Sequence, residues 1–254
     1  MDKKLWKGTR YQQMHKQMIV AANGIVDDIF VLKTGVLITK KSRVTAEAKQ
    51  LFDQMNIDTT RPVYEQHAEF NSRLTYLSFK DQQESAAAYN QRLIQEYGHR
   101  SVYNDEHVTF LIAGCALETS LEFVAHNEAT IARLTSSKTN AQNNPFFKLL
   151  GYPHQPEYLE KQKQVVAQYL EQKDKANELT NILAPGNKAT SFTISMSIKD
   201  WHKTLIGRLS LHGVETDMRQ VMEEVARQLK VNYPLFFNTI EEYYALGNNK
   251  KYEE

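Results

Sequence analysis

The segment from Gly98 to Asn140 constrains the fold most, because it joins a strand pattern directly to a helix pattern. Val108 to Ile112 is an apolar run with β-branched and aromatic members, which favours a buried strand. Gly114 is expected to end or bend that strand. Apolar residues then recur at helical spacing and predict a helix over 117–124. The same segment holds the densest set of reactive side chains in the chain, so we expect most of any active site here.

The rest of the chain predicts helices separated by a few short strands. Helices are predicted over residues 8–23, 45–55, 82–96, 156–180, 198–211 and 216–231, and short strands or a hairpin around Lys33 to Gly35. Ala189 to Ser197 alternates apolar and hydroxyl side chains, which predicts a further strand. Residues 71–78 are expected to be partly extended, and the polar segment from Tyr243 onward is expected to fray. Because strands and helices do not alternate regularly, the predicted fold class is α+β.

The overall charge and the single cysteine limit the classes of function. The formal net charge is +1 over 254 residues, so no global attraction favours nucleic acid or an acidic membrane. No run of about 18 apolar residues is present, so no membrane span is expected. The first residues lack the apolar core of a signal peptide. Cys115 lies in an apolar run and is expected to be a buried, reduced thiol, which favours a cytoplasmic protein.

Patterns for several common catalytic centres are absent from the sequence. There is no glycine-rich phosphate loop, no dinucleotide fingerprint, no Gly-x-Ser-x-Gly turn and no spacing typical of zinc ligands. What remains is a hydroxyl-rich segment from Thr130 to Thr139 with Arg133 and Lys138, which suits an anion held by hydroxyls, amides and charge. The alternative is a solvated start of a capped helix. On the residues alone, His126 is more often a structural histidine.

Two motifs in this part of the chain carry a resemblance to a known family. Gly98-His99-Arg100-Ser101 and Glu106-His107-Val108-Thr109-Phe110 resemble the Gly-His-x-Ser-x-x-Glu-His segment and Phe-Thr-Phe-like strand of the flavin-dependent thymidylate synthases, with two extra residues between the halves. Ala125-His126-Asn127, Thr130 and Thr135-Ser136-Ser137 align with the family signature of Arg-His-Arg, then Ser, then Ser-x-Arg. Both arginines beside the histidine are thus replaced, and Lys138 follows the position of the last one.

Shorter matches extend the resemblance to roughly residues 64–235. Asn71 to Thr75 is similar to the family's Ala-Arg-x-Ser region, and Leu183 to Gly186 is similar to its Leu-Pro turn. The remaining matches are Ser197-Ile198-Lys199 for Asn-x-Arg, Gly207-Arg208 for Leu-Arg, and Val214 to Arg219 for Ala-Gln-x-Glu-Ile-Arg. Lys199 keeps the charge of the family's arginine but lacks its planar fork.

The resemblance implies a fold and a reaction. The fold would be flavin-dependent thymidylate synthase-like, a mixed sheet with long helices over residues 64–240. An extension with a hairpin (1–63) would precede it, and a polar tail (241–254) would follow. The reaction would be methylation of the uracil ring of deoxyuridylate, with FAD bound and with NADPH and methylenetetrahydrofolate as co-substrates. The family is homotetrameric and shares each flavin site between chains, so a homo-oligomer is expected.

The resemblance also implies roles for particular residues. Cofactor-binding roles fall on Arg73, His99, Glu106, His126, Asn127, Thr130 and Arg208. Substrate-binding roles fall on Arg133, Ser136, Ser137, Lys138, Lys199 and Arg219, and catalytic roles fall on Thr135 and Arg219. No metal site is expected. Two alternatives stay open, namely a diverged homologue that acts on another nucleotide or nucleoside, and a non-catalytic binding relative.

Overall fold

The structure is a computed structural model that describes residues 22–26, 29–32, 34–79, 84–125, 128–133, 146–148, 156–172, 183–211 and 213–249. The chain forms two compact units. The first unit consists of residues 1–37, 110–194 and 213–225, and the second consists of residues 38–109, 195–212 and 226–254. Three strands and one long helix contribute residues to both units, because the unit boundaries fall within them.

The main sheet has the order β3 (Gly35–Lys41), β4 (His107–Ala116), β7 (Ala189–Ser197), β5 (Thr130–Arg133). Thr109 Oγ1 donates to Ser195 Oγ at 3.1 Å, and the Gly114 amide donates to Ser191 Oγ at 3.3 Å. Residue numbers rise along β4 while they fall along β7, so these two strands are antiparallel. The predicted strands 108–112 and 189–197 are therefore confirmed, and Gly114, with φ of 76°, bends β4 without ending it.

A smaller sheet lies in the first unit and has the order β1 (Ala22–Val26), β2 (Ile29–Leu32), β6 (Phe146–Phe147). β1 pairs antiparallel with β2, and β2 pairs parallel with β6. Short strands or a hairpin were predicted around Lys33 to Gly35. The two strands are confirmed as β2 and β3, but they form no hairpin with one another, because β2 pairs with β1 and β3 belongs to the other sheet.

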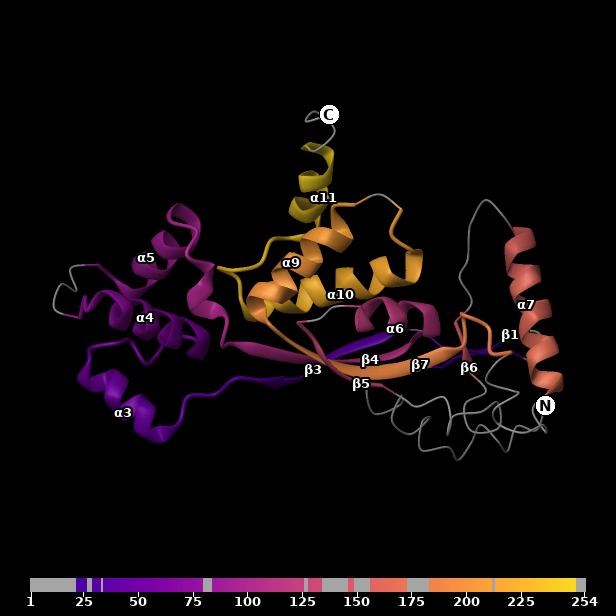
Figure 1. Ribbon diagram of the computed structural model, residues 1–254, viewed down its shortest axis with the longest axis horizontal. Coiled ribbons are helices and arrows are strands. Elements are labelled where there is room, and N and C mark those ends of the chain that lie inside the picture. The colour runs from indigo at the N-terminus through magenta and orange to yellow at the C-terminus, as the bar shows by residue number, and fades with distance from the viewer. Residues whose placement is uncertain are drawn as a thin grey trace. The chain divides into compact units, whose positions relative to one another are not determined.

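Among the described residues, two helices and the start of a third also belong to the first unit. These are α6 (Leu117–Val124), α7 (Pro156–Glu171) and the first part of α10 (Thr216–Asn232). Phe123 of α6 packs on Phe192 of β7 with ring centroids 5.1 Å apart, and Figure 1 shows α6 lying against the sheet. The predicted helices 117–124 and 216–231 are confirmed. α7 ends at Glu171, and residues 173–180 of its predicted range lie outside the described residues, as does most of the helix predicted over 8–23.

A buried carboxylate joins the start of α10 to the start of α6. Asp217 is fully buried and accepts hydrogen bonds from the Ala116 amide and from Thr119 Oγ1, both at 2.8 Å. Lys148 Nζ lies 3.3 Å from the same carboxylate and donates to Thr34 Oγ1 at 2.8 Å. This network ties together four segments that are far apart in the sequence of the first unit.

The second unit is mainly helical. Its elements are α3 (Ala46–Gln54), α4 (Val63–Tyr76), α5 (Ala86–Gln91), the π-helix η1 (Arg92–Glu96), the 3-10 helix η2 (Arg100–Tyr103), α9 (Ile198–Leu209), the end of α10, and α11 (Ile240–Asn249). Thr45 caps α3, since its side chain accepts from the Ala48 amide at 3.2 Å. The predicted helices 45–55 and 198–211 are confirmed.

The prediction that residues 71–78 are partly extended is wrong, because α4 continues to Tyr76 and ends at Leu77 with φ of 50°. The buried face of this helix includes Glu69, Ser72 and Arg73, which are satisfied by hydrogen bonds rather than by apolar contact. Hydrophobic periodicity does not register a polar buried face, so the sequence pattern concealed the helix.

The expectation that the chain frays from Tyr243 is also wrong over α11. Tyr243 is fully buried, and its hydroxyl lies 2.9 Å from Nδ1 of His202 on α9. Figure 1 shows α9 and α11 beside one another. Gly247 permits this approach, because a Cβ at that position would lie 1.9 Å from the Ser210 carbonyl oxygen. None of the described helices has the length and apolar character that crossing a membrane requires.

Candidate functional site

A cavity of about 310 Å³ lies within the second unit. It is lined by Arg73, Tyr76, Ser78, Glu84, Tyr89, Arg92, Leu93, Tyr97 and His99. The described lining residues combine aromatic rings with two arginines and one carboxylate. Such a surface suits a ligand that has a planar ring and a negatively charged or oxygen-rich group.

Three short segments supply most of the lining residues. The last turn of α4 carries Arg73 and Tyr76, and the α5–η1 junction carries Tyr89, Arg92 and Leu93. Positions 89, 92 and 93 are spaced i, i+3 and i+4, so their side chains share one helix face. Gly98 adopts φ of 62° after this helical run, which turns the chain between Tyr97 and His99.

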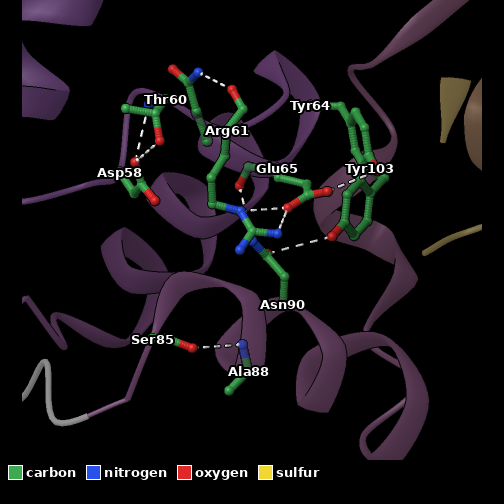
Figure 2. Close-up of polar contacts among 10 residues, drawn as sticks. Asp58, Thr60, Arg61, Tyr64, Glu65, Ser85, Ala88, Asn90 and Tyr103 are labelled. Atoms are coloured by element: carbon green, nitrogen blue, oxygen red, sulfur yellow. Dashed lines mark hydrogen bonds and ion pairs between the residues drawn. The ribbon is translucent and has the colours of Figure 1, made fainter. Parts of the chain in front are cut away.

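A buried polar cluster fixes α4 against α5 and η2 (Figure 2). The side chain of Asn90 donates to the Glu65 carbonyl at 3.3 Å and accepts from the Tyr103 hydroxyl at 3.5 Å. The Glu65 carboxylate accepts from the Tyr64 hydroxyl at 2.9 Å and pairs with Arg61, whose Nε lies at 2.6 Å. Because all these groups are paired, the helices that carry the two main walls of the cavity are held in a defined spacing.

Arg73 forms the deepest cationic group of the cavity and is 2% exposed. Its Nε donates to Glu69 at 2.8 Å, its Nη1 donates to the Ser78 carbonyl at 3.2 Å, and its guanidinium lies 4.3 Å from the centre of the Tyr89 ring. The Nη2 group donates no hydrogen bond to any residue in the described ranges. A buried donor without an acceptor costs about 1–3 kcal/mol. This nitrogen is therefore suited to an oxygen of a bound ligand.

Arg92 is the second cation and is held by Glu84. Its Nε and Nη2 lie 3.1 Å and 2.5 Å from the two carboxylate oxygens, and Nη1 donates to the Tyr97 hydroxyl at 3.2 Å. The guanidinium also lies 5.5 Å from the Tyr89 ring centre and 5.3 Å from that of Tyr97. Hydrogen bonding from Arg92 lowers the pKa of the Glu84 carboxyl, which is therefore ionised at neutral pH.

Exposed aromatic rings form the outer part of the cavity. Tyr76 and His99 are stacked with an interplanar angle of 24° and centroids 6.4 Å apart, and Tyr97 lies 5.9 Å from His99. Tyr76 and Tyr97 are 61% and 56% exposed. Exposed rings at this density provide faces on which a planar ligand ring can stack.

Two of the residues predicted to bind cofactor, Arg73 and His99, are brought together in this cavity. Glu106 is not part of its lining. This carboxyl is buried and accepts from the Tyr233 hydroxyl at 3.0 Å, and burial raises its pKa. Its geometry fits a structural role in the second unit, and its role towards a cofactor stays a prediction.

The other predicted site residues lie elsewhere. In the first unit, Arg133 on β5 donates to Ser120 Oγ at 3.1 Å, Thr130 is exposed on the same strand, and Arg219 is half-buried on α10. In the second unit, Lys199 is exposed and Arg208 is half-buried, both on α9. The residues outside the described ranges are His126, Asn127, Thr135, Ser136, Ser137 and Lys138. The roles of all these residues stay predictions.

Sequence reasoning missed most of the cavity. Glu84, Tyr89, Arg92 and Tyr97 were not predicted, although the i, i+3 spacing of Tyr89 and Arg92 was a signal that they share a face.

Cys115 was predicted correctly as a buried thiol: it is free and fully buried, and burial raises its pKa well above the usual value. Among the described residues, no cluster of three potential ligands could hold a metal ion.

Comparisons with known proteins place the chain in a family. The family profile described as Thymidylate synthase complementing protein matches residues 50–235. The fold is similar to that of thymidylate synthase X from Helicobacter pylori, solved with FAD and dUMP, with a TM-score of 0.58 and 15% identity over 84% of this chain and 99% of that one. It is also similar to the UMP/dUMP methylase PolB from Streptomyces cacaoi, solved with 5-Br UMP, with a TM-score of 0.57 and 12% identity over 85% of this chain and 95% of that one.

No sequence among curated proteins matches the chain. The family match nevertheless spans most of its length, and both structural neighbours cover their own chains almost completely. The α+β fold with a mixed sheet and long helices is thus confirmed, and the sequence resemblance is confirmed with it. The chain belongs to the family of thymidylate synthase complementing proteins, the flavin-dependent thymidylate synthases.

Proposed function

We propose that this protein binds FAD and methylates the uracil ring of deoxyuridylate, with methylenetetrahydrofolate and NADPH as co-substrates. The observation that carries this proposal is the cavity of the second unit, in which Arg73 and His99 lie among aromatic rings. Family membership supports the reaction class. The substrates named for the two structural neighbours, dUMP and UMP, support a uracil nucleotide as the methyl acceptor.

The cavity residues fit part of a flavin dinucleotide. A volume of about 310 Å³ is at the lower end of the range for ligand pockets, so the cavity suits one ring system and its adjacent group. Tyr76, Tyr97 and His99 offer faces for stacking, and Nη2 of Arg73 offers a buried donor. The rest of the dinucleotide would extend beyond this cavity. We therefore propose a homo-oligomer, with a homotetramer expected, in which a neighbouring chain covers that part.

The residues of this chain would act by binding and orientation. FAD supplies the hydride chemistry when it is bound. Arg73 would hold a ligand oxygen through Nη2, while Tyr89 beneath its guanidinium keeps that group in place. Arg133 and Arg219 of the first unit and Lys199 of the second unit are each proposed to contribute to nucleotide binding, and Thr135 would contact the reacting base. Charged hydrogen bonds of this kind contribute about 1.5–3 kcal/mol each.

A second candidate is a related enzyme that methylates a different uracil nucleotide. Ser137 and Lys199 stand where the resemblance places arginines, so the forked contacts that a guanidinium makes to phosphate are lost at both positions. A site with fewer such contacts is expected to differ in substrate choice. The Streptomyces neighbour, described as a UMP/dUMP methylase, shows that this fold is associated with more than one nucleotide.

Tritium release from the uracil ring tests both candidates. Protein loaded with FAD is incubated with NADPH, methylenetetrahydrofolate and either dUMP or UMP, each labelled at the carbon that is methylated. Release from dUMP supports the first candidate, and release from UMP alone supports the second. A flavin-loaded sample that releases tritium from neither nucleotide would contradict both and leave the binding relative.

We also propose that residues 64–240 form the catalytic domain, that 1–63 and 241–254 are appended segments, and that the protein is cytoplasmic. Truncation after residue 240 would remove most of α11, including buried Tyr243. The appended C-terminal segment is therefore expected to support the fold rather than the chemistry. Thermal unfolding of the truncated chain, compared with flavin binding per folded molecule, separates these contributions.

A further inference from the structure

We infer that Glu84 occupies the position of an anionic ligand group at Arg92, so that a phosphate group displaces Glu84 when the ligand binds. This inference rests on the proposed function, because FAD brings phosphate groups to the cavity. It assigns Glu84 a role as an internal competitor that sets the preference of the cavity for charged ligands. Three observations support it. The two arginine–glutamate pairs differ in burial, Arg92 has contacts other than Glu84 that hold it in place, and Glu84 precedes the cap of α5.

Both arginines of the cavity pair with a glutamate, and the two pairs differ in burial. Arg73 and Glu69 lie on the same helix at i and i+4, and both side chains are 3% exposed. Arg92 and Glu84 are 34% and 30% exposed and belong to different elements. Breaking a buried pair strands a charge away from water, whereas an exposed pair contributes little to stability. The Arg92–Glu84 pair is therefore the one that an incoming anion can open.

Arg92 keeps its position without Glu84. Its Nη1 donates to the Tyr97 hydroxyl at 3.2 Å, and its guanidinium lies within 5.5 Å of two aromatic ring centres. Cation–π contacts of this kind hold an arginine independently of an anion. After displacement of Glu84, Nε and Nη2 of Arg92 would donate to two phosphate oxygens in place of the two carboxylate oxygens.

Glu84 can leave without disturbing the helix that follows it. The helix α5 begins at Ala86, and Ser85 caps it by accepting from the Ala88 amide at 3.2 Å. Glu84 precedes this cap, and among the described residues its side chain bonds only to the side chain of Arg92. Its movement would therefore leave Tyr89 and Arg92 in place. Arg73 Nη2, which is unpaired among the described residues, adds a second donor for the same ligand.

The test compares Glu84→Gln with Glu96→Gln, which makes the same change in charge at an exposed position of η1 outside the cavity. Binding of FAD, riboflavin and inorganic pyrophosphate is measured for the full chain by calorimetry. Glu84→Gln is expected to bind FAD and pyrophosphate about tenfold more tightly, because no carboxylate competes for Arg92. Riboflavin, which has no phosphate, should bind equally to both variants and to the wild type.

The inference is overturned if Glu84→Gln binds FAD and pyrophosphate no more tightly than the wild type, or if riboflavin gains as much as FAD. Should Glu84→Gln not fold by circular dichroism, Glu84→Ala serves as the second variant with the same expectation. The experiments distinguish failure of this inference from failure of the proposed function. Tighter pyrophosphate binding without any flavin binding would retain the inference and reject the function, and flavin-dependent tritium release without an effect of Glu84 would do the reverse.

Discussion

At the scale of single residues, the protein depends on a few buried charges whose partners come from distant parts of the chain. Asp217 is fully buried and Lys148 is 8% exposed, and each is satisfied by the other and by hydroxyl or amide groups. Glu106 is buried with a Tyr233 hydroxyl as donor. Such groups contribute little to the stability of the fold while they are paired, but removal of one partner lowers that stability strongly.

Replacement of Asp217 by Asn should lower the free energy of unfolding by about 3–5 kcal/mol, because Lys148 would keep a buried charge without its counter-ion. The carboxamide retains one acceptor for the Ala116 amide, so the lost term is mainly the ion pair. Urea denaturation at neutral pH measures the change. The control is Glu157→Gln on α7, which is exposed and should change stability by less than about 0.5 kcal/mol. Equal effects for both variants would argue against the ion pair.

Glu106 predicts a particular dependence of stability on pH. Burial raises its pKa above the unfolded value near 4.5, so the folded state holds its proton to higher pH than the unfolded state. This contribution is present below the unfolded pKa and is lost as pH rises through the folded pKa. Glu106→Gln should remove that loss, since the amide stays neutral and still accepts from Tyr233. Stability measured from pH 4 to 8 should fall less with pH for this variant; a slope as steep as that of the wild type would contradict the assignment.

At the scale of elements, periodicity in the sequence predicted those helices and strands whose buried face is apolar. β4, β7, α6, α9 and α10 belong to this group, and their predicted ranges agree with the structure within a few residues. α4 was missed because its buried face carries Glu69, Ser72 and Arg73. α11 was missed because its stability comes from Tyr243 packing on α9, a contact that no local pattern contains.

The turn at Gly98 is expected to control the outer wall of the cavity. Ala at this position would have to adopt φ of 62°, which costs about 1–2 kcal/mol, although no atom lies within 4 Å of its added Cβ. Gly98→Ala should thus destabilise the protein and weaken flavin binding by shifting Tyr97 and His99. Gly207→Ala is the control, because Gly207 lies within α9 with equally open space. That change should be neutral or stabilising by up to about 1 kcal/mol. If Gly207→Ala destabilised the protein more than Gly98→Ala, this account of the turn would be refuted.

At the scale of the whole molecule, the family motifs and the cavity have two residues in common. The resemblance singled out Arg73 and His99 by their position in short motifs, and the fold brings these two residues into one cavity. The aromatic and charged residues around them could not be predicted, because α4 and α5 come together through buried hydrogen bonds between Glu65, Asn90 and Tyr103. The resemblance therefore indicated two residues that the fold brings into one cavity, and tertiary structure determined the other residues of its lining.

The central claim is that flavin stacks on the aromatic wall of this cavity. Titration of the purified protein with FAD, followed by quenching of flavin fluorescence, tests it most directly. His99→Ala should weaken FAD binding by about tenfold or more, since stacking on an aromatic side chain contributes about 1–3 kcal/mol. His107→Ala, an exposed histidine of the same unit outside the cavity, should bind as the wild type does. A wild-type protein that does not quench FAD, or a His99→Ala variant that binds FAD unchanged, would contradict the claim.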